Sequence, residues 1–414
     1  MDFDTLLRKA VEKGASDLHL KANKPPIVRI NGNLYSLLLS DDRHQKPPLL
    51  AADQLNAFAQ HVLSPQQHAR FLQGREVDCG YPLPEGGRFR INICLQEGLP
   101  RFVCRYIAEH IRTLEELGLP AILSQLAATP RGLILVTGAA GSGKSTTLAA
   151  LIDSISRNRS CHVLTIEDPI EFSFKDRRSL VTQREVGRDS ESFAMALKYA
   201  LRQDPDVILV GEMRDEETIQ MALQAAETGH LVLSTLHTVD AAETVNRILG
   251  AVSNGQGQLR QQLVSVLVAI ISQRLLAQRD GKVRVPATEV LVANARVREI
   301  LADPHRLPEL RQVIEESENA GMHSFDQSLL RLVFEGVISR HEARLHCSNA
   351  QDFELRLKGV MPGDLAERAL PPLPHQAADT NTQAAPSSAK IEIESLTLQQ
   401  GTPKEKHSGK PGGA

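Results

Sequence analysis

Tryptophan is absent from this 414-residue sequence, and aromatic residues make up only 4% of it. Leucine, isoleucine, valine and alanine must therefore form most of the core. The five cysteines contain no Cys-x-x-Cys pair, so the sequence gives no sign of a zinc module. Their odd number and wide spacing are typical of proteins of a reducing compartment. They are Cys79, Cys94, Cys104, Cys161 and Cys347.

Long hydrophobic runs and a strong charge imbalance are also missing. The longest apolar run, residues 263–271, is interrupted by Ser265 and is too short to span a bilayer. Residues 1–4 are acidic and lack the apolar core of a signal peptide, so we expect a cytoplasmic protein. The net charge of -3 gives no global reason to expect nucleic acid or an anionic membrane as a partner.

One glycine-rich segment fills every fixed position of the Gly-x-x-x-x-Gly-Lys-Ser phosphate-loop pattern. The apolar run 133–136 before it predicts a buried strand, and apolar residues within 148–155 fall on one helix face. In this order, backbone N–H groups and the helix N-terminus surround a phosphate chain. We expect Lys144 to reach the β- and γ-phosphates of ATP and Ser145 to ligate Mg²⁺. The predicted nucleotide-binding loop is Gly138, Ala139, Ala140, Gly141, Ser142, Gly143, Lys144, Ser145 and Thr146.

Carboxylates follow two further predicted strands. The strand at 163–166 leads into Glu167 and Glu171, and the strand at 207–210 leads into Glu212. Open α/β sheets bind ligands beyond the C-terminal ends of their strands, where acids hold Mg²⁺ or orient a water. Glu212 fits the Walker B position, a second metal ligand beside Ser145. For the first group, a capped turn before Pro169 is the alternative interpretation.

Histidines stand at both boundaries of another predicted strand, 231–236. His230 precedes it and His237 follows it. A single histidine is usually a structural residue, whereas a pair in the sheet of a nucleotide-binding domain is a candidate sensor of the γ-phosphate. Both interpretations stay open from the residues alone.

Residues 1–111 predict a small α+β domain. A short helix ends near Gly14, Asn31-Gly32 marks a hairpin, and residues 54–72 are helix-rich. Strict alternation at 88–93 and a second strand at 101–107 place arginines on one face of a sheet. The two of interest, Arg90 and Arg105, either contact an anion or lie on a solvated face.

Residues 112–370 predict the nucleotide-binding domain with C-terminal helices, and residues 371–414 a disordered tail. In the tail, residues 391–398 could become ordered on a partner, with plain disorder as the alternative. Further elements are predicted as a helix capped by Ser190, a helical stretch 258–276 and a strand 283–291. Helices are also predicted at 298–301, 310–315 and 325–334.

Together these motifs resemble the secretion ATPases, specifically the twitching-motility branch of PilT and PilU that powers type IV pilus retraction. The resemblance covers about residues 1–360. It rests on GAAGSGKS at 138–145, TIEDPIEF at 165–172, LRQDPDVILVGEMRD at 201–215, AAETGH at 225–230 and TLHT at 235–238, with ASDLHL at 15–20 and GMHSFDQ at 321–327.

The resemblance implies a RecA-like P-loop ATPase domain after a PAS-like N-terminal domain, assembled as a homo-hexamer with ATP and Mg²⁺. It implies Glu171 as general base within an acidic box that includes Glu167, and Glu212 as Walker B. It also implies His230 and His237 as a His box, and Arg90 and Arg105 as arginines that reach nucleotide. The implied setting is the cytoplasmic base of the pilus machine, at an inner-membrane platform protein, with a paralogous retraction ATPase as a further partner.

Three segments depart from the family pattern. The turn Gln96-Glu97-Gly98 lacks a common arginine, Ala139-Ala140 replaces a common Pro-Thr, and a characteristic PilT segment survives only partly at 296–303. The last departure leaves open whether the chain is PilT-like or an accessory, PilU-like ATPase. The missing zinc module disfavours a pilus-extension motor.

Two other function classes compete with the motor. A nucleotide-gated scaffold or regulator would bind ATP and hydrolyse it poorly, but the intact Lys144, Ser145, Glu171 and Glu212 disfavour it. A nucleic-acid translocase would need a basic stripe, and no Lys/Arg cluster supplies one, so we expect no nucleic-acid partner.

Overall fold

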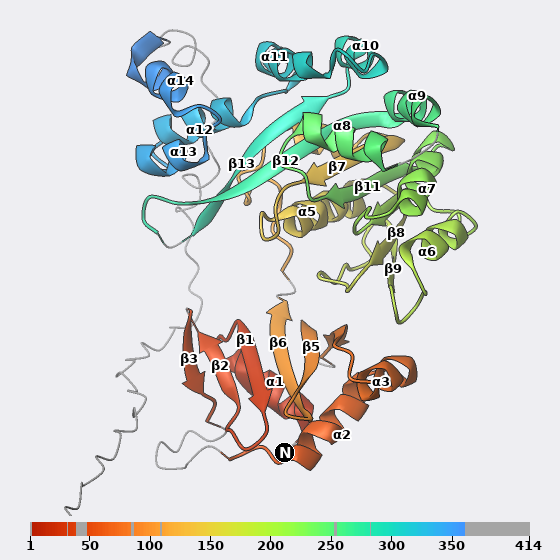
Figure 1. Cartoon of the computed structure of the whole chain (residues 1–414), viewed down its shortest axis with the longest axis vertical. Helices are drawn as coiled ribbons and strands as arrows, with labels where there is room; N and C mark the ends of the chain where they lie inside the picture. The colour runs from red at the N-terminus through yellow and green to blue at the C-terminus, as the bar shows by residue number, and fades with distance from the viewer. Residues whose placement is uncertain are drawn as a thin grey trace, which may run out of the picture.

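The computed structural model describes residues 2–30, 32–38, 48–83, 87–107, 110–251, 255–281 and 283–360. These residues form two parts, an N-terminal sheet with helices and a larger C-terminal α/β part (Figure 1). The predicted hairpin residue Asn31 and the predicted tail, residues 371–414, lie outside the described residues.

The N-terminal part is an antiparallel sheet of six strands in the order β3-β2-β1-β6-β5-β4. The hairpin predicted near residue 31 is confirmed, since Ile30 pairs with Asn33. The two helices predicted within 54–72 are also confirmed, with Pro65 beginning the second. The elements are α1 (Phe3–Glu12), β1 (Asp17–Lys21), β2 (Ile27–Ile30), β3 (Asn33–Ser36), α2 (Ala52–Val62), α3 (Pro65–Leu72), β4 (Val77–Pro82), β5 (Arg88–Gln96) and β6 (Leu99–Ile107).

Alternation along the strands gives this sheet one apolar and one polar face. On the apolar side, Phe3 of α1 packs with its ring centroid 5.3 Å from that of Phe58 and 5.8 Å from that of Phe102. On the polar side, Arg90 of β5 lies opposite Arg105 of β6. The predicted arginine face therefore exists and is not buried in the N-terminal core.

The C-terminal part contains a seven-stranded sheet in the order β13-β12-β7-β11-β10-β8-β9, parallel except for the antiparallel pair β12–β13. Its strands are β7 (Gly132–Thr137), β8 (His162–Glu167), β9 (Leu180–Glu185), β10 (Val207–Val210), β11 (Leu231–Leu236), β12 (Leu267–Ala277) and β13 (Arg284–Val292). Its first helices are α4 (Ile122–Ala127), α5 (Lys144–Asn158), α6 (Phe193–Ala200), α7 (Glu216–Glu227), α8 (Ala241–Gly250) and α9 (Gln256–Val266).

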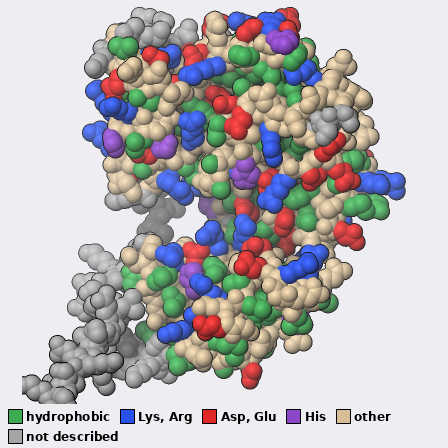
Figure 2. Space-filling view, in the orientation of Figure 1, with side chains coloured by type: hydrophobic (Ala, Val, Ile, Leu, Met, Phe, Trp, Pro, Cys, Tyr) green, Lys and Arg blue, Asp and Glu red, His purple; other side chains and the backbone are tan. Residues whose placement is uncertain are grey.

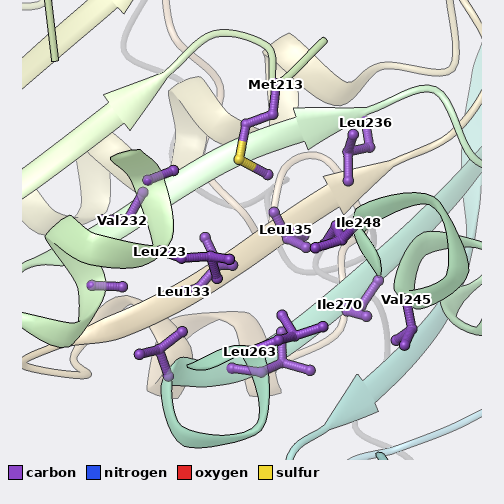
Figure 3. Packing of buried hydrophobic residues seen from close by; sticks show 14 of the residues in the cluster. Leu133, Leu135, Met213, Leu223, Val232, Leu236, Val245, Ile248, Leu263 and Ile270 are labelled. Carbon is purple, nitrogen blue, oxygen red and sulfur yellow. The ribbon is translucent and has the colours of Figure 1, made fainter. Parts of the chain in front are cut away.

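Helices cover both faces of this sheet, which is why its central strands are apolar throughout. In β7, Leu133 and Leu135 pack toward the layer of α6 to α9, whereas Ile134 and Val136 pack toward α4 and α5. Figure 3 shows the first of these layers, where Leu223, Ile248 and Leu263 meet the strands. The aliphatic core predicted from the composition is confirmed here.

Short helices complete the C-terminal end and pack partly on the long β12–β13 pair (Figure 1). The helices predicted near 298–301, 310–315 and 325–334 are confirmed as α10, α11 and α12. The elements are α10 (Ala295–Ala302), η1 (Leu307–Glu309), α11 (Leu310–Glu316), η2 (Glu318–Ala320), α12 (Phe325–Phe334), α13 (Arg340–His346), α14 (Ala350–Leu355) and η3 (Arg356–Val360).

Two predictions about this part were wrong. The stretch 258–276 is not one helix, because α9 ends at Val266 and β12 begins at Leu267. Its apolar residues fit a helical face, but the β-branched Ile270 and Ile271 are buried between two layers as in a central strand. The cap of α6 is Ser192, whose Oγ accepts a hydrogen bond from Met195 N (3.2 Å), and not Ser190.

Candidate active site

The glycine-rich segment joins the end of β7 to α5, in the predicted order of strand, loop and helix. Gly143 is the N-cap residue with φ of 93°, and no described side chain caps this helix end. At Gly138, φ is 143° and an added Cβ would lie 2.4 Å from the main-chain oxygen of Gln273. Only glycine fits both positions, so the loop keeps helix N–H groups open to an anion.

Lys144 is buried beneath this loop. Its Nζ donates hydrogen bonds to the main-chain oxygens of Gly138 (2.8 Å) and Ala139 (3.0 Å). Burial lowers the pKa of Lys144, while the charges of Glu212 and Glu171 oppose that effect. The ammonium group is therefore held at the loop by weak neutral acceptors that a phosphate oxygen can replace.

Strand β12 lies beside the loop and supports it. The helix predicted over 258–276 did not indicate this role. Gln273 Oε1 accepts a hydrogen bond from Thr147 Oγ (2.8 Å), and Thr137 Oγ donates to Ser272 Oγ (2.9 Å). The buried Oγ of Ser142 has no partner among the described residues. An unpaired hydroxyl in a glycine cradle is consistent with a polar ligand at this position.

Glu212 follows β10, and its charge acts on Lys144. Its carboxylate pairs with Arg214 Nη2 (2.8 Å) and with His237 Nε2 (3.2 Å), and His237 Nδ1 lies 3.5 Å from Lys144 Nζ. Burial alone would raise the pKa of Glu212, but Arg214, His237 and Lys144 together hold it below its ordinary value. Glu212 is thus an anionic oxygen donor, the type of ligand that Mg²⁺ prefers.

Glu167 and Glu171 begin and end a short turn after β8. Glu167 is buried, and its oxygens accept from Thr165 Oγ (2.7 Å), Gln183 Nε2 (3.1 Å) and the Glu171 amide (3.4 Å). Burial raises the pKa of Glu167. Glu171 is partly exposed, with 35% of its side chain accessible, so it is the better placed of the two to meet a water.

Arg90 reaches this turn from the N-terminal part. Its Nη1 lies 3.4 Å from Glu171 Oε1, and its Nε lies 3.8 Å from Asp78 Oδ1. Arg105 instead pairs within its own sheet, with Nε 3.0 Å from Asp17 Oδ1. Figure 2 shows charged and histidine side chains gathered along the hollow between the two parts. The structure therefore brings Arg90, but not Arg105, to the acidic turn.

Comparison with known proteins gives the family. The model of the type II/IV secretion system protein family matches residues 89–328. A type IV pilus retraction ATPase, PilT, of Pseudomonas aeruginosa is 40% identical over 85% of this chain and 100% of its own. A type IV pilus ATPase, PilU, of the same organism is 40% identical over 86% of this chain and 92% of its own. A crystal structure of the pilus retraction motor PilT with bound ADP matches with a TM-score of 0.76 and 42% identity, over 86% of this chain and 99% of that one.

The chain belongs to the PilT/PilU family of secretion ATPases. Its larger part has the RecA-like α/β fold of that family, as predicted, and follows an α+β N-terminal part. The identity to PilT of Pseudomonas aeruginosa equals the identity to PilU of the same organism, so these two identities do not separate the branches.

Within this family fold, the two predicted histidines lie at opposite ends of the central strand β11. His230 precedes β11, and its Nδ1 lies 2.9 Å from the Ala225 main-chain oxygen. The six residues of β11 separate it from the phosphate loop by roughly 20 Å. Of the two histidines, only His237 lies at the loop of its own chain, and a role for both as sensors of the γ-phosphate stays a prediction.

A cavity of about 750 Å³ opens beside the loop. Gly143 and Thr146 of the loop region line it, together with Arg112 before α4 and Gln278 after β12. Such a volume is typical of small-molecule sites. No sequence pattern indicated this cavity, because its walls come from the segment before α4, the β12–β13 pair and the segment after α12.

Within the described ranges, no three His, Cys, Asp or Glu side chains are grouped so that they could hold a metal ion. Mg²⁺ at Ser145 and Glu212 would thus need further oxygens from phosphate and water, as is usual for this ion. No helix among the described residues has both the length and the apolar character that a bilayer crossing requires.

Proposed function

We propose that this chain is an ATP-hydrolysing motor that powers type IV pilus retraction. The convergence of Lys144, Glu212 and Glu171 at the C-terminal edge of one parallel sheet carries this proposal. The PilT relative and the PilT crystal structure are both named for pilus retraction, which supports retraction as the direction of pilus movement.

The loop and the cavity suit a nucleoside triphosphate. The phosphates would lie on the loop, where Lys144 exchanges the Gly138 and Ala139 oxygens for β- and γ-phosphate oxygens. The base would enter the 750 Å³ cavity beside Gly143 and Thr146. When bound, Mg²⁺ would neutralise charge on the phosphates, with Ser145 and Glu212 as its protein ligands.

Glu171 is the proposed general base. Its carboxylate takes a proton from the water whose oxygen attacks the γ-phosphorus, while the bond to the ADP oxygen breaks. In the present arrangement Arg90 lies 3.4 Å from that carboxylate. A rotation of the N-terminal domain would free Glu171 and bring the Arg90 guanidinium to the developing phosphate charge, with His237 at the loop edge.

The motor is proposed to act as a homo-hexamer of chains with domains 1–111 and 112–370. ATP binding would draw the two domains together, and release would let them part. Around a ring at the cytoplasmic face of the inner membrane, these rotations would turn a pilus platform protein and return pilus subunits to the bilayer. An accessory, PilU-like role beside a paralogous ATPase is the second candidate, favoured by the altered segment at 296–303.

The test is phosphate release by purified protein in ATP and Mg²⁺. Lys144→Ala should abolish turnover, because it removes the cation that serves the phosphates, while circular dichroism reports a retained fold. Lys198→Ala, an exposed lysine of α6, is the matched control and should hydrolyse ATP as the unmodified protein does. Turnover near the unmodified rate in Lys144→Ala would refute the site.

A further inference from the structure

Glu185 is a buried charge that the proposed chemistry does not use. It ends β9, the edge strand of the large sheet, with its side chain only 2% exposed. The register of β8 and β9 sets it opposite Glu167. Sequence patterns gave no sign of β9, because residues 180–185 lack an apolar run.

Both parts of the molecule supply partners to this carboxylate. From the N-terminal sheet, Arg88 Nη2 lies 2.6 Å from Oε2, and the Gly80 amide donates to Oε1 at 3.2 Å. Among the described residues Glu185 is the only ion-pair partner of Arg88, whose side chain is 13% exposed. A Cβ on Gly80 would lie 2.3 Å from Arg88 Nη2 and 2.6 Å from Glu185 Oε2, so this junction is closely fitted.

The third partner belongs to the acidic turn. Glu185 Oε2 also accepts a hydrogen bond from the Ile170 amide (3.2 Å), and the next amide, that of Glu171, donates to Glu167 (3.4 Å). Two buried carboxylates therefore bind the main-chain amides of Ile170 and Glu171 and fix the backbone that carries the Glu171 side chain. One of them, Glu185, is shared with the N-terminal sheet.

We propose that Glu185 is a positioning residue that couples the place of the N-terminal domain to the orientation of Glu171. The inference rests on the proposed function of Glu171 as general base. If Arg88 withdraws as the domain moves, this buried carboxylate loses the only ion pair that it makes among the described residues, which is unfavourable. Glu185 must then shift or recruit other donors, and the Ile170 amide shifts with it.

Neighbouring strand positions reinforce the coupling. Arg88 and Arg90 are two residues apart on β5, so both project from the same face of the sheet. Arg88 reaches Glu185 and Arg90 reaches Glu171. One movement of β5 therefore changes the partners of both carboxylates at once.

The experiment compares Glu185→Gln, Arg88→Gln, their double variant and Arg88→Lys in the full assembled chain. Arg101→Gln, an exposed arginine of β6, is the matched control. We measure kcat and KM for ATP, and amide hydrogen exchange of the peptide 168–174 without nucleotide. The exchange measurement reports the turn itself and needs no catalytic activity.

Each Gln variant should lower kcat about tenfold or more while KM stays within about threefold, because a turn that no longer follows the domain movement leaves the base misplaced for the chemistry more than for binding. Exchange at 168–174 should become faster in both. The double variant should resemble a single one, since both changes break one contact. Arg88→Lys should retain more turnover than Arg88→Gln, and Arg101→Gln should match the unmodified chain.

An Arg88→Gln protein with unmodified kcat and unmodified exchange at 168–174 would overturn the proposal. Losses in kcat that track a lowered melting temperature and add in the double variant would also overturn it, as a purely structural role. If Glu185→Gln fails to fold, Arg88→Gln and Gly80→Ala still show whether this contact affects kcat and exchange at 168–174. An unmodified chain without ATP turnover would refute the proposed function, and the exchange result would then decide the coupling between domains separately.

Discussion

At the scale of single residues, Glu167 and Glu171 show how surroundings divide two similar side chains. Glu167 is buried and accepts hydrogen bonds from Thr165 and Gln183, so it stabilises the turn. Glu171 is partly exposed and faces Arg90 of the N-terminal sheet. The first is suited to a structural role, and the second to meeting water.

Glu171→Gln should therefore keep ATP binding and lose most hydrolysis. A positioned base contributes on the order of 10² to 10⁴ in rate, and the isosteric amide cannot take the proton. Single-turnover phosphate release and fluorescent-nucleotide binding measure the two effects. A small loss here beside a severe loss in Glu167→Gln would show that the other carboxylate is the base.

Individual site residues were also the features that the sequence predicted most directly. Lys144, Glu212 and His237 lie close together because each follows an apolar strand and parallel strands end at one edge, and their roles at a nucleotide stay a prediction. The pattern did not show that His230 lies at the end of β11 away from the loop, because it does not say which residues near two strands share an end. Glu185 and Gln273 were missed because nothing local distinguishes them.

At the scale of elements, the junction of β13 with α8 contains another buried acid. Glu289 Oε1 accepts a hydrogen bond from the Ala241 amide at the start of α8 (2.9 Å). Burial is the main cause that raises the pKa of Glu289 from 4.5 to about 7, and that hydrogen bond opposes the rise in part. Folded protein thus keeps this proton over a range in which unfolded chain has lost it.

The sign of the pH effect follows from proton binding. Between pH 4.5 and about 7 the folded state binds more protons at Glu289, so its contribution to stability falls as pH rises through this window. Glu289→Gln should remove that slope and raise the free energy of unfolding at pH 8 by about 1–3 kcal/mol. Urea titrations at pH 5 and pH 8 check this, and equal slopes in both proteins would contradict it.

The boundaries of helices and strands were harder to predict from sequence than the positions of the site residues. Residues 258–276 satisfy a helical pattern, yet the chain changes from α9 to β12 at Val266 because both sheet faces need apolar cover. Periodicity does not distinguish a buried helix from a strand buried on both faces. Strand β9 was missed for the opposite reason, since an edge strand can be largely polar.

At the scale of the whole molecule, function depends on how the two parts meet. Arg90 already contacts Glu171, whereas Arg105 is held by Asp17 in its own sheet. We expect Arg105 to reach nucleotide only after the N-terminal domain moves or from a neighbouring chain of a hexamer. Sequence could place both arginines on one face, but no pattern within one chain specifies the docking of two domains.

Alanine at Arg90 or at Arg105 should lower ATP turnover with little effect on hexamer formation. Both side chains lie on the polar face of the sheet, so their loss leaves the N-terminal core intact. Turnover assays with light scattering for oligomer mass provide the check. Unchanged turnover in both single variants and the double variant would show that this face is only a solvated surface.

The most direct test of the retraction motor is made in the cell that encodes it. The chromosomal gene is replaced by the Lys144→Ala variant, and surface pili and twitching are measured together. The account predicts pili that are retained or more abundant, with twitching reduced, because assembly continues while retraction loses its ATPase. Complete loss of surface pili would contradict it and would identify the chain as an assembly motor.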